Sequence, residues 1–312
     1  MKYYVGIDIG GTFIKGAVVN GEGETLAYKK VPTECAVSNM RVVENVSALT
    51  DELIKTANAR REDVVGIGVG VPGIVDTEKG VVICSENLYF QNFPIAEEIS
   101  KLTGFSVKIA NDANAAALGE AKFGAGKRYS DTVMVTLGTG VGGGIIIGGK
   151  LFEGNLGAGA ELGHMVIKAG GKRCACGRRG CFESYSSARA LVRMSKAEAR
   201  KNPASLLGQV PLSEISGKTP FDLADKDEVA GRVVENYIKM LACGLANIAN
   251  IFRPEAIIIG GGVSAEGERL LAPLEKEFHK EVFAAELGPR VELIIAERKN
   301  DAGYLGAAAL IM

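Results

Sequence analysis

The chain has 312 residues, of which 47% are hydrophobic and 23% charged, and its 36 basic side chains nearly cancel its 37 acidic ones. This length is enough for two packed lobes, and the near-zero charge excludes a broad attraction to nucleic acid or to a membrane surface. The N-terminus has no secretory apolar core, and no apolar run approaches the roughly 18 residues that span a bilayer, so we expect a cytosolic protein with a small partner.

The N-terminal part of the chain predicts a strand meander followed by a helix. Short β-branched and apolar runs between glycine-rich turns are typical of strands. Strands are expected over residues 3–8, 13–19, 26–31 and 64–69. Gly10-Gly11-Thr12 forms the first turn, and apolar residues at helical spacing predict a helix over 40–58.

A polar corner follows the strand expected over 107–110. Asn111-Asp112 precedes an alanine-rich segment that stops at Gly124, which predicts a helix with a polar cap and a glycine end. A carboxylate at a helix N-terminus is favoured in its negative form, so Asp112 could accept a proton at neutral pH. From position alone, a catalytic base and a simple helix cap are equally good interpretations of Asp112.

The unit of strand, glycine turn and strand recurs in the second half. Later strands are expected over 132–137, 144–147 and 255–259, and later helices over 266–283 and 302–312. Gly138-Thr139-Gly140 separates the first two of these strands, and Gly260-Gly261-Gly262 follows the third. A duplicated unit indicates two related lobes with a cleft between them, whereas two unrelated hairpins would be the alternative.

The glycine turns are candidate phosphate-binding loops. Consecutive backbone N–H groups can hold phosphate oxygens, and a carboxylate such as Asp8 can orient Mg²⁺ through water. Gly138-Thr139-Gly140 would bind the same triphosphate from the other lobe. Gly138, Gly140 and Gly143 also match the spacing of dinucleotide-binding folds, but that motif must lead into a helix, and here Ile145-Ile146-Ile147 predicts a strand.

Three of the six cysteines lie within eight positions, close to a histidine. His164, Cys174, Cys176 and Cys181 offer one nitrogen and three sulfur ligands, and the glycines among them let the chain bend around a tetrahedral zinc ion. Because protein would fill all four positions, such an ion would be structural. A redox pair or a cluster of free thiols is the alternative.

Basic residues surround the cysteines. Lys172, Arg173, Arg178 and Arg179 would fit a zinc finger that contacts nucleic acid. No recognition helix follows at the expected spacing, which argues against that interpretation.

Together these motifs resemble the ROK family of bacterial sugar kinases and sugar-responsive repressors, within the actin, hexokinase and Hsp70 superfamily. The resemblance runs nearly end to end, and the cysteine signature is its most specific part. The segments that carry it are Asp8–Thr12, Asn111-Asp112, Leu137–Gly144, Glu161–His164, Cys174–Glu183 and Ile259–Gly262.

The resemblance implies an α/β protein with the two-lobed actin-like (ribonuclease H-like) ATPase fold, in which duplicated mixed sheets flank an interlobe cleft. The smaller lobe would span 1–110, with 301–312 packing back on it as a helix. The larger lobe would span 111–300 and contain the zinc loop 164–183. Family members commonly form dimers or tetramers, so we expect a homo-dimer or tetramer without nucleic acid or membrane partners.

The resemblance also implies residue roles. Asp112 would be the catalytic base and would contact the sugar together with Asn111. The other implied sugar contacts are Asn87, Glu161, His164 and Glu183. The implied ATP and phosphate contacts are Asp8, Gly10, Gly11, Thr12, Gly138, Thr139, Gly140, Gly260, Gly261 and Gly262. Glu161 could instead cap a helix or pair with Arg189, and Lys15 is left outside the site because a strand lysine is as well explained by solvation.

The predicted function is ATP-dependent phosphorylation of a hexose at its 6-hydroxyl, with Mg²⁺ and a structural Zn²⁺. Glucose is the first choice, while N-acetylglucosamine, mannose, N-acetylmannosamine and fructose stay open because one polar set can hold several hydroxylated rings. The alternative of another class is a sugar-sensing transcriptional regulator. Only seven residues precede Asp8, which leaves no room for a DNA-binding module and favours the kinase.

Overall fold

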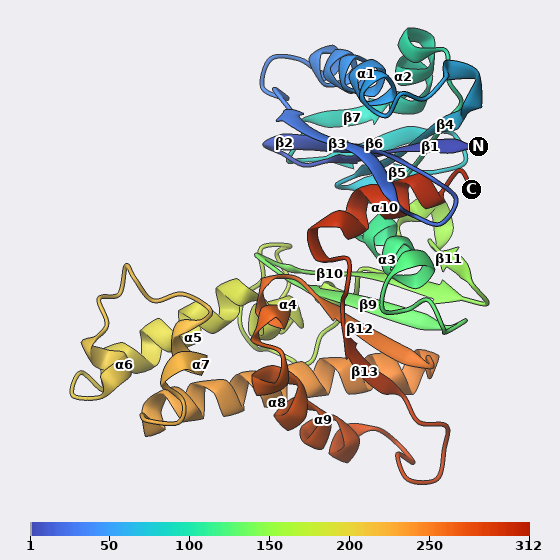
Figure 1. The fold of residues 1–312 in the computed structure, drawn as a ribbon. Coiled ribbons are helices and arrows are strands. Elements are labelled where there is room, and N and C mark those ends of the chain that lie inside the picture. Colours follow the sequence, from blue (N-terminus) through green and yellow to red (C-terminus); the bar gives the residue numbers. More distant parts are fainter. Residues whose placement is uncertain (1) are drawn as a thin grey trace. The chain divides into compact units, whose positions relative to one another are not determined.

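The first sheet carries the N-terminal hairpin. The computed structural model describes residues 2–312, and Figure 1 shows its elements in chain order. Five strands build this sheet, in the order β3-β2-β1-β4-β8. Their bounds are β1 Tyr3–Ile9, β2 Phe13–Val19, β3 Thr25–Pro32, β4 Val64–Val71 and β8 Val107–Asn111. The pairs β1–β2 and β2–β3 are antiparallel, whereas β1–β4 and β4–β8 are parallel, so the sheet is mixed.

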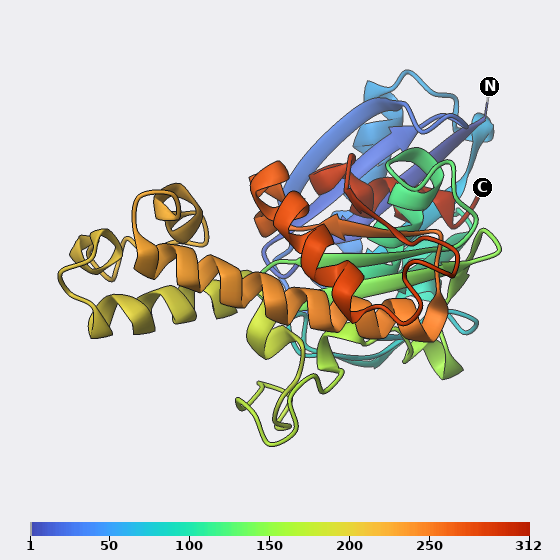
Figure 2. The same cartoon turned by 90° about the horizontal axis from the view of Figure 1, so that it is seen from below.

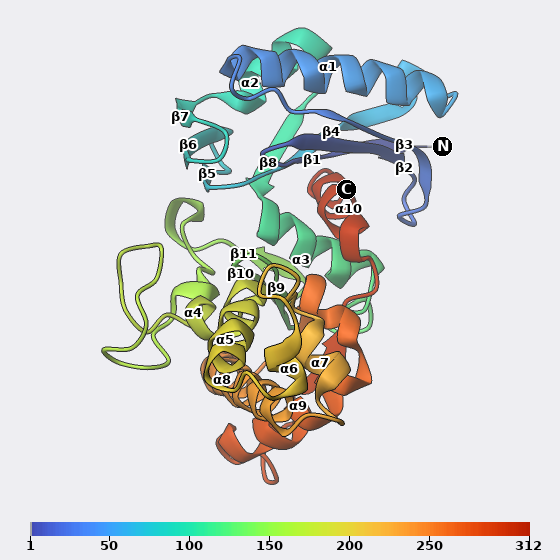
Figure 3. The ribbon, with the colours of Figure 1, turned by 90° about the vertical axis from the view of Figure 1, so that its left-hand side faces the viewer.

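Helices cover both faces of this sheet. Helix α1 (Asn39–Thr56) and helix α2 (Ile95–Thr103) lie on one face, and helix α10 (Ala302–Ala309) lies on the other (Figure 3). Buried apolar side chains of β1, β4 and α1 form a continuous core between sheet and helices. Both faces of this sheet are therefore covered. This explains why its strands are nearly unbroken runs of apolar residues.

Two glycines allow α10 to approach the sheet closely. A Cβ atom on Gly6 would lie 1.9 Å from the carbonyl oxygen of Tyr304, and one on Gly68 would lie 1.7 Å from that of Ala307. Because any side chain at these positions would collide with backbone, glycine fixes the distance between α10 and the sheet. Helix α3 (Asp112–Phe123) packs beside α10 and starts at the end of β8.

A small antiparallel sheet follows β4. It consists of β5 (Ile74–Asp76), β6 (Val81–Ser85) and β7 (Phe90–Phe93) in that order. The connection from β6 to β7 buries Leu88 and leaves Asn87 exposed. One predicted sugar contact is thereby placed at the tip of a short hairpin.

The second large sheet repeats the strand order of the first. It runs β11-β10-β9-β12-β13, with an antiparallel pair at one edge and parallel pairs at the other. The strands are β9 Thr132–Leu137, β10 Val141–Ile147, β11 Lys150–Phe152, β12 Ala256–Gly260 and β13 Glu292–Ile295. The α/β class with duplicated mixed sheets, expected from the sequence, is confirmed.

The helices of the second half are arranged along α8, the longest helix (Figure 2). They are α4 Glu183–Ser186, α5 Ala188–Lys201, α6 Leu206–Gln209, α7 Thr219–Leu223, α8 Glu228–Phe252 and α9 Glu268–Glu281. Helices α5, α7 and α9 pack on α8, whose buried face includes Tyr237, Leu241 and Leu245. Among residues 2–312, no helix combines the length and the apolar character that a membrane crossing requires.

One predicted boundary differs at the third glycine turn. The helix expected over 266–283 starts later, at Glu268, because Gly267 has a φ of +57° that interrupts the preceding turn. Gly262–Glu266 is a 3₁₀ turn, so the triple glycine does not open directly into the α-helix.

The described chain divides into two units of dense internal contact. The first contains the chain up to Ser130, Gly144–Ala160 and Glu297–Met312; the second contains Asp131–Gly143 and Glu161–Ala296. One division falls inside β10. Contact density is not the same property as a functional lobe, so the lobes 1–110 with 301–312 and 111–300 stay a prediction.

Candidate functional site

The Asn111-Asp112 corner is fixed by its own hydrogen bonds. The side-chain oxygen of Asn111 accepts the N–H groups of Ala113 and Asn114 at 2.9 and 3.2 Å, so Asn111 is the N-cap of α3. Its amide nitrogen donates to the carbonyl of Gly73 at 2.9 Å. Both lone pairs of the amide oxygen are therefore used, and the second amide N–H is the group left for a ligand.

Asp112 is the first residue of α3 and is partly buried. Its Oδ1 accepts the N–H of Ala113 at 2.9 Å. The helix N-terminus stabilises negative charge here, which suits a carboxylate that accepts a proton.

A partly buried ion pair lies beside the first glycine turn. Asp8, near the end of β1, lies 3.4 Å from the ammonium of Lys15, and its side chain is 20% exposed. Burial raises the pKa of Asp8, while the charge and hydrogen bond of Lys15 act in the opposite direction. Lys15, left out of the site on sequence grounds, thus contacts a predicted site residue; the signal for this was the antiparallel register, which sets Lys15 opposite Asp8.

The backbone of the first turn is held from its own sheet and lies near Asn87. The hydroxyl of Thr33 donates to the carbonyl of Gly10 at 2.6 Å. A Cβ atom on Gly11 would stand 3.6 Å from the carbonyl oxygen of Asn87. The structure therefore brings a predicted phosphate turn and a predicted sugar contact together within the first unit.

The second glycine turn and the triple glycine are neighbours within the second unit. The N–H of Gly138 donates to the carbonyl of Gly140 at 3.0 Å, which closes the hairpin between β9 and β10. Gly261 has a φ of +82°, and a Cβ atom there would lie 2.6 Å from the backbone of Leu137. The segment after Gly143 is a strand, as predicted, but β10 already starts at Val141 and not at the expected residue 144. Gly143 therefore lies inside a strand, which excludes the helix that a dinucleotide-binding motif needs.

The four predicted metal ligands converge. The ligand atoms of His164, Cys174, Cys176 and Cys181 all lie within 4.8 Å of one another. The sulfurs of Cys176 and Cys181 are 3.7 Å apart, close to the ~3.8 Å that two sulfurs keep around a tetrahedral zinc with bonds of about 2.3 Å. The donor set and its spacing fit a structural zinc ion.

The thiols of this loop differ in their surroundings. The backbone N–H of Arg178 lowers the pKa of Cys176, which is exposed. Burial raises the pKa of Cys181 to about 12. A cation bound among these sulfurs would stabilise the thiolate form of each of them.

The loop 164–183 carries the four candidate ligands and is called the metal loop below; an aromatic side chain anchors it to α8. Phe182, which follows Cys181, is fully buried, and a Cβ atom on Gly244 would lie 2.1 Å from its ring. The hydroxyl of Tyr237 donates to the carbonyl of Ser186 at 2.7 Å. Helix α8 thus holds α4 at its start, through Phe182, and at its last residue, Ser186.

Glu183 connects the metal loop with the second glycine turn. Its Oε2 accepts the N–H of Val141 at 3.1 Å, and its Oε1 lies 3.6 Å from the sulfur of Cys174. A Cβ atom on Gly140 would be only 2.2 Å from the same Oε2. Sequence reasoning placed Glu183 among the sugar contacts and missed this link, because the residues are more than forty positions apart.

Glu161 precedes the 3₁₀ turn Leu162–His164 and is exposed. Its side chain makes no cap hydrogen bond, and within residues 2–312 its carboxylate forms no ion pair, with Arg189 or otherwise. Glu161, His164 and Glu183 belong to the second unit, whereas Asn87, Asn111 and Asp112 belong to the first. The predicted sugar contacts are thus divided between the two units.

Comparison with known proteins agrees with these features. A sequence profile of the ROK family matches residues 4–312. The glucokinase of Streptomyces coelicolor is 38% identical over 99% of this chain and 98% of its own. A solved ROK glucokinase of Streptomyces griseus, in complex with glucose and AMPPNP, is 38% identical with a TM-score of 0.80, over 99% of this chain and 98% of that one. The xylose repressor of Caldicellulosiruptor bescii is 31% identical over 99% of this chain but only 77% of the repressor.

The duplicated sheets and their glycine turns define the fold class as that of the two-lobed sugar kinases of the actin and hexokinase superfamily. Within that class, the chain belongs to the ROK family. The family membership expected from the motifs is confirmed.

Proposed function

We propose that this ROK protein is an ATP-dependent sugar kinase that phosphorylates a hexose, glucose first, at the 6-hydroxyl. The observation that carries the proposal is the Asn111-Asp112 corner, where a partly buried carboxylate is oriented by a helix N-terminus. The likeness to glucokinases over almost the whole length of both chains supports the same activity.

In this reaction Asp112 accepts the proton of the sugar 6-hydroxyl. The freed oxygen forms a bond to the γ-phosphorus of ATP, and the bond between that phosphorus and the β,γ-bridging oxygen breaks, so ADP leaves with the electron pair. Positioning and charge stabilisation supply most of the acceleration in phosphoryl transfer. A base fixed by backbone contacts needs little reorganisation when the substrate binds.

The nucleotide is proposed to lie against the glycine turns. The turns Gly10-Gly11-Thr12 in one lobe, and Gly138-Thr139-Gly140 and Gly260-Gly261-Gly262 in the other, would hold phosphate oxygens with their backbone N–H groups. Within these turns, the N–H groups of Gly10 and Gly138 already donate to the carbonyls of Phe13 and Gly140. Bound Mg²⁺ would neutralise charge on these phosphates. Asp8 would orient that ion through water, and Lys15 balances the charge of Asp8.

The hexose is proposed to contact both lobes. Asn87, Asn111 and Asp112 would approach it from one side, and Glu161, His164 and Glu183 from the other. Amide and carboxylate groups select hydroxylated rings, because an analogue without a hydroxyl would leave a buried partner unpaired. Structural zinc at His164, Cys174, Cys176 and Cys181 would fix the loop that carries His164 and Glu183.

The setting of the enzyme is also a proposal. We expect lobes at 1–110 with 301–312 and at 111–300, a cytosolic location, and a homo-dimer or tetramer. Kinases for N-acetylglucosamine, mannose, N-acetylmannosamine or fructose remain alternatives. The match to xylose repressors keeps a sugar-sensing regulator as the alternative of another class, but near-complete coverage of glucokinases favours catalysis.

A coupled assay of ATP consumption with a panel of hexoses tests the proposal. We expect turnover with at least one hexose and the highest kcat/KM with glucose. No turnover with any of these sugars, together with binding of a DNA operator fragment that a sugar releases, would instead establish the regulator. Turnover with another hexose at the highest kcat/KM would retain the kinase and correct the substrate.

A further inference from the structure

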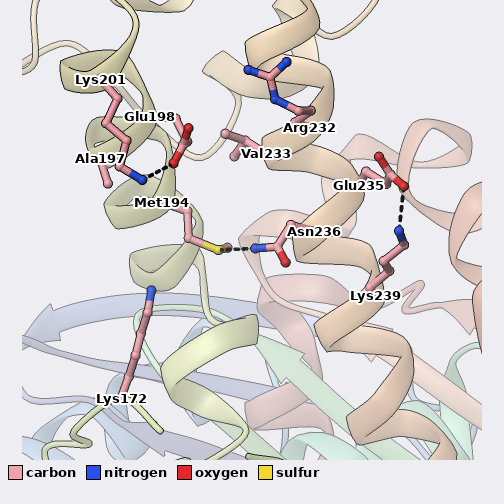
Figure 4. Close-up of a pocket in the computed structure, with 10 residues that line it drawn as sticks. All are labelled: Lys172, Met194, Ala197, Glu198, Lys201, Arg232, Val233, Glu235, Asn236 and Lys239. Carbon is pink, nitrogen blue, oxygen red and sulfur yellow. Dashed lines mark hydrogen bonds and ion pairs between the residues drawn. The ribbon is translucent and has the colours of Figure 1, made fainter.

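A groove between α5 and α8 carries charged side chains that the proposed reaction does not use. It has a volume of about 480 Å³. Figure 4 shows Glu198 and Lys201 on one helix, Arg232 and Lys239 on the other, and Lys172 extending toward the groove from the metal loop. None of the predicted sugar, phosphate or metal contacts is among the described residues that line the groove.

The groove borders a strongly basic part of the chain, which includes the basic residues around the cysteines. Residues 165–201 contain ten Lys or Arg side chains and two carboxylates, a formal charge of +8, in a chain whose net charge is −1. Like charges held at this density repel one another. A bound anion would relieve that repulsion, and neither the metal ligands nor the sugar contacts explain the excess.

The cations that line the groove differ in their partners. Lys201 pairs with Glu198 at 2.7 Å, and Lys239 pairs with Glu235 at 2.6 Å. For Lys172, no carboxylate of residues 2–312 lies within ion-pair distance. Lys172 thus marks the position in the groove where an anionic group would be most stabilised.

The rest of the lining indicates what the anion is attached to. Met194 and Val233 contribute apolar surface, and Asn236 contributes an amide whose nitrogen lies 3.4 Å from the sulfur of Met194. Glu198 and Glu235 can accept hydrogen bonds from hydroxyl groups. These two carboxylates would repel a long polyanion such as nucleic acid, and the volume exceeds what a lone phosphate ion needs.

We propose that this groove binds a small phosphorylated polyol, such as a sugar phosphate, with its phosphate at Lys172 and Lys201 and its hydroxyls toward Glu198 and Asn236. The site is separate from the proposed catalytic residues. It does not rest on the kinase activity, because charge and cavity are properties of the groove itself.

Isothermal titration calorimetry of the full, metal-loaded chain with glucose 6-phosphate tests this site. We expect binding that the double variant Lys172→Gln/Lys201→Gln weakens about tenfold or more, since it removes charge-assisted hydrogen bonds. Arg232→Gln, on the other helix, should weaken binding severalfold. Higher salt should weaken binding to the natural chain, because the site is open to solvent.

Lys280→Gln is the matched control, since Lys280 pairs with Glu277 three positions away at 2.6 Å, as Lys201 does with Glu198 at 2.7 Å. The affinity of this variant for glucose 6-phosphate should equal that of the natural chain. Circular dichroism and metal content should show that all variants are folded and loaded.

Equal affinity of the natural chain and a folded double variant would place the probe elsewhere and overturn the proposal, whatever the catalytic site binds. Inorganic phosphate binding as tightly as glucose 6-phosphate would overturn the polyol assignment. Tighter binding of a single-stranded oligonucleotide, lost in the double variant, would overturn it in favour of nucleic acid. If the natural chain shows no kinase activity but binds glucose 6-phosphate, and the double variant loses this binding, the groove site is supported although the proposed function fails.

Discussion

The turn between β1 and β2 is supported by residues of its own sheet region, whereas the turn between β9 and β10 is supported by the metal loop and the start of α5. In the first, Thr33 donates to the carbonyl of Gly10, and Lys15 pairs with Asp8. In the second, Glu183 accepts the N–H of Val141, and the N–H of Ala188 donates to the carbonyl of Gly138. The two large sheets have the same strand order, but their glycine turns depend on different parts of the molecule for support.

Glu183 lies next to Cys174 and also holds the second turn. Disturbing the metal ligands should therefore disturb the second turn and leave the first one intact.

The largest expected effect comes from a change that touches neither turn. Asp112→Asn should lower kcat by about 10²–10⁴-fold, because an amide cannot accept the hydroxyl proton. Sugar and nucleotide affinities should stay close to those of the natural chain. A coupled kinetic assay and calorimetric titration of glucose measure the two quantities; a variant with full turnover would remove Asp112 from the role of base.

Loss of the metal should affect the two turns unequally. Cys176→Ala removes a ligand that is exposed, so little packing is lost with it. We expect zinc content to fall to near zero and kcat/KM to fall about 10–100-fold, as when support of a metal site is removed. Elemental analysis and hydrogen exchange of the peptides around Gly11 and Gly140 check this; equal protection changes in both turns would contradict the comparison.

Two glycine substitutions test whether Glu183 positions the second glycine turn. Gly140→Ala places a methyl group 2.2 Å from Oε2 of Glu183, whereas Gly138→Ala meets open space. We expect Gly140→Ala to separate Glu183 from Val141 and to raise the KM for ATP about tenfold, the effect of losing one charge-assisted hydrogen bond. Gly138→Ala is the matched control and should change this KM little. Similar KM values for both variants would show that Glu183 does not position the turn.

The smallest effect concerns the ion pair beside the first turn. Burial raises the pKa of Asp8 above its usual 3.8 despite Lys15. A raised pKa means that the folded state binds the proton more tightly than the unfolded state, so this contribution to stability is complete below the unfolded value and is lost as the pH rises through the folded one. Asp8→Asn should therefore raise the melting temperature at pH 7 relative to the natural chain, and the difference should shrink toward pH 4.

Asp63 provides the control of opposite sign. The hydrogen bond from Arg60 lowers the pKa of Asp63, so its stabilising contribution is present above the unfolded value and is lost on acidification. Asp63→Asn should therefore not raise the melting temperature at neutral pH. Thermal scans of both variants between pH 4 and pH 7 measure the contrast, and parallel curves would show that burial does not govern Asp8.

Local chemistry explains which parts of the site could be predicted from sequence. Glycine turns between apolar runs, a polar corner before an alanine-rich helix, and soft ligands at short spacing depend on neighbouring residues. For the same reason the glycine-rich Gly138–Gly143 segment could be separated from a dinucleotide-binding motif by the isoleucines after it. The helix after the third glycine turn begins at Glu268, two residues later than the hydrophobic pattern predicts, because that pattern does not reveal the positive φ of Gly267.

The sequence by itself determined the ROK family, the repeated hairpins and a candidate set of metal ligands, because each depends on residue types at short, regular spacing. Only the tertiary structure decided that Glu183 supports Val141, that Lys15 neutralises Asp8 and that Lys172 faces the α5–α8 groove without a carboxylate partner among residues 2–312. Such contacts depend on side-chain direction and on strand register between distant segments, and hydrophobic periodicity fixes neither of them.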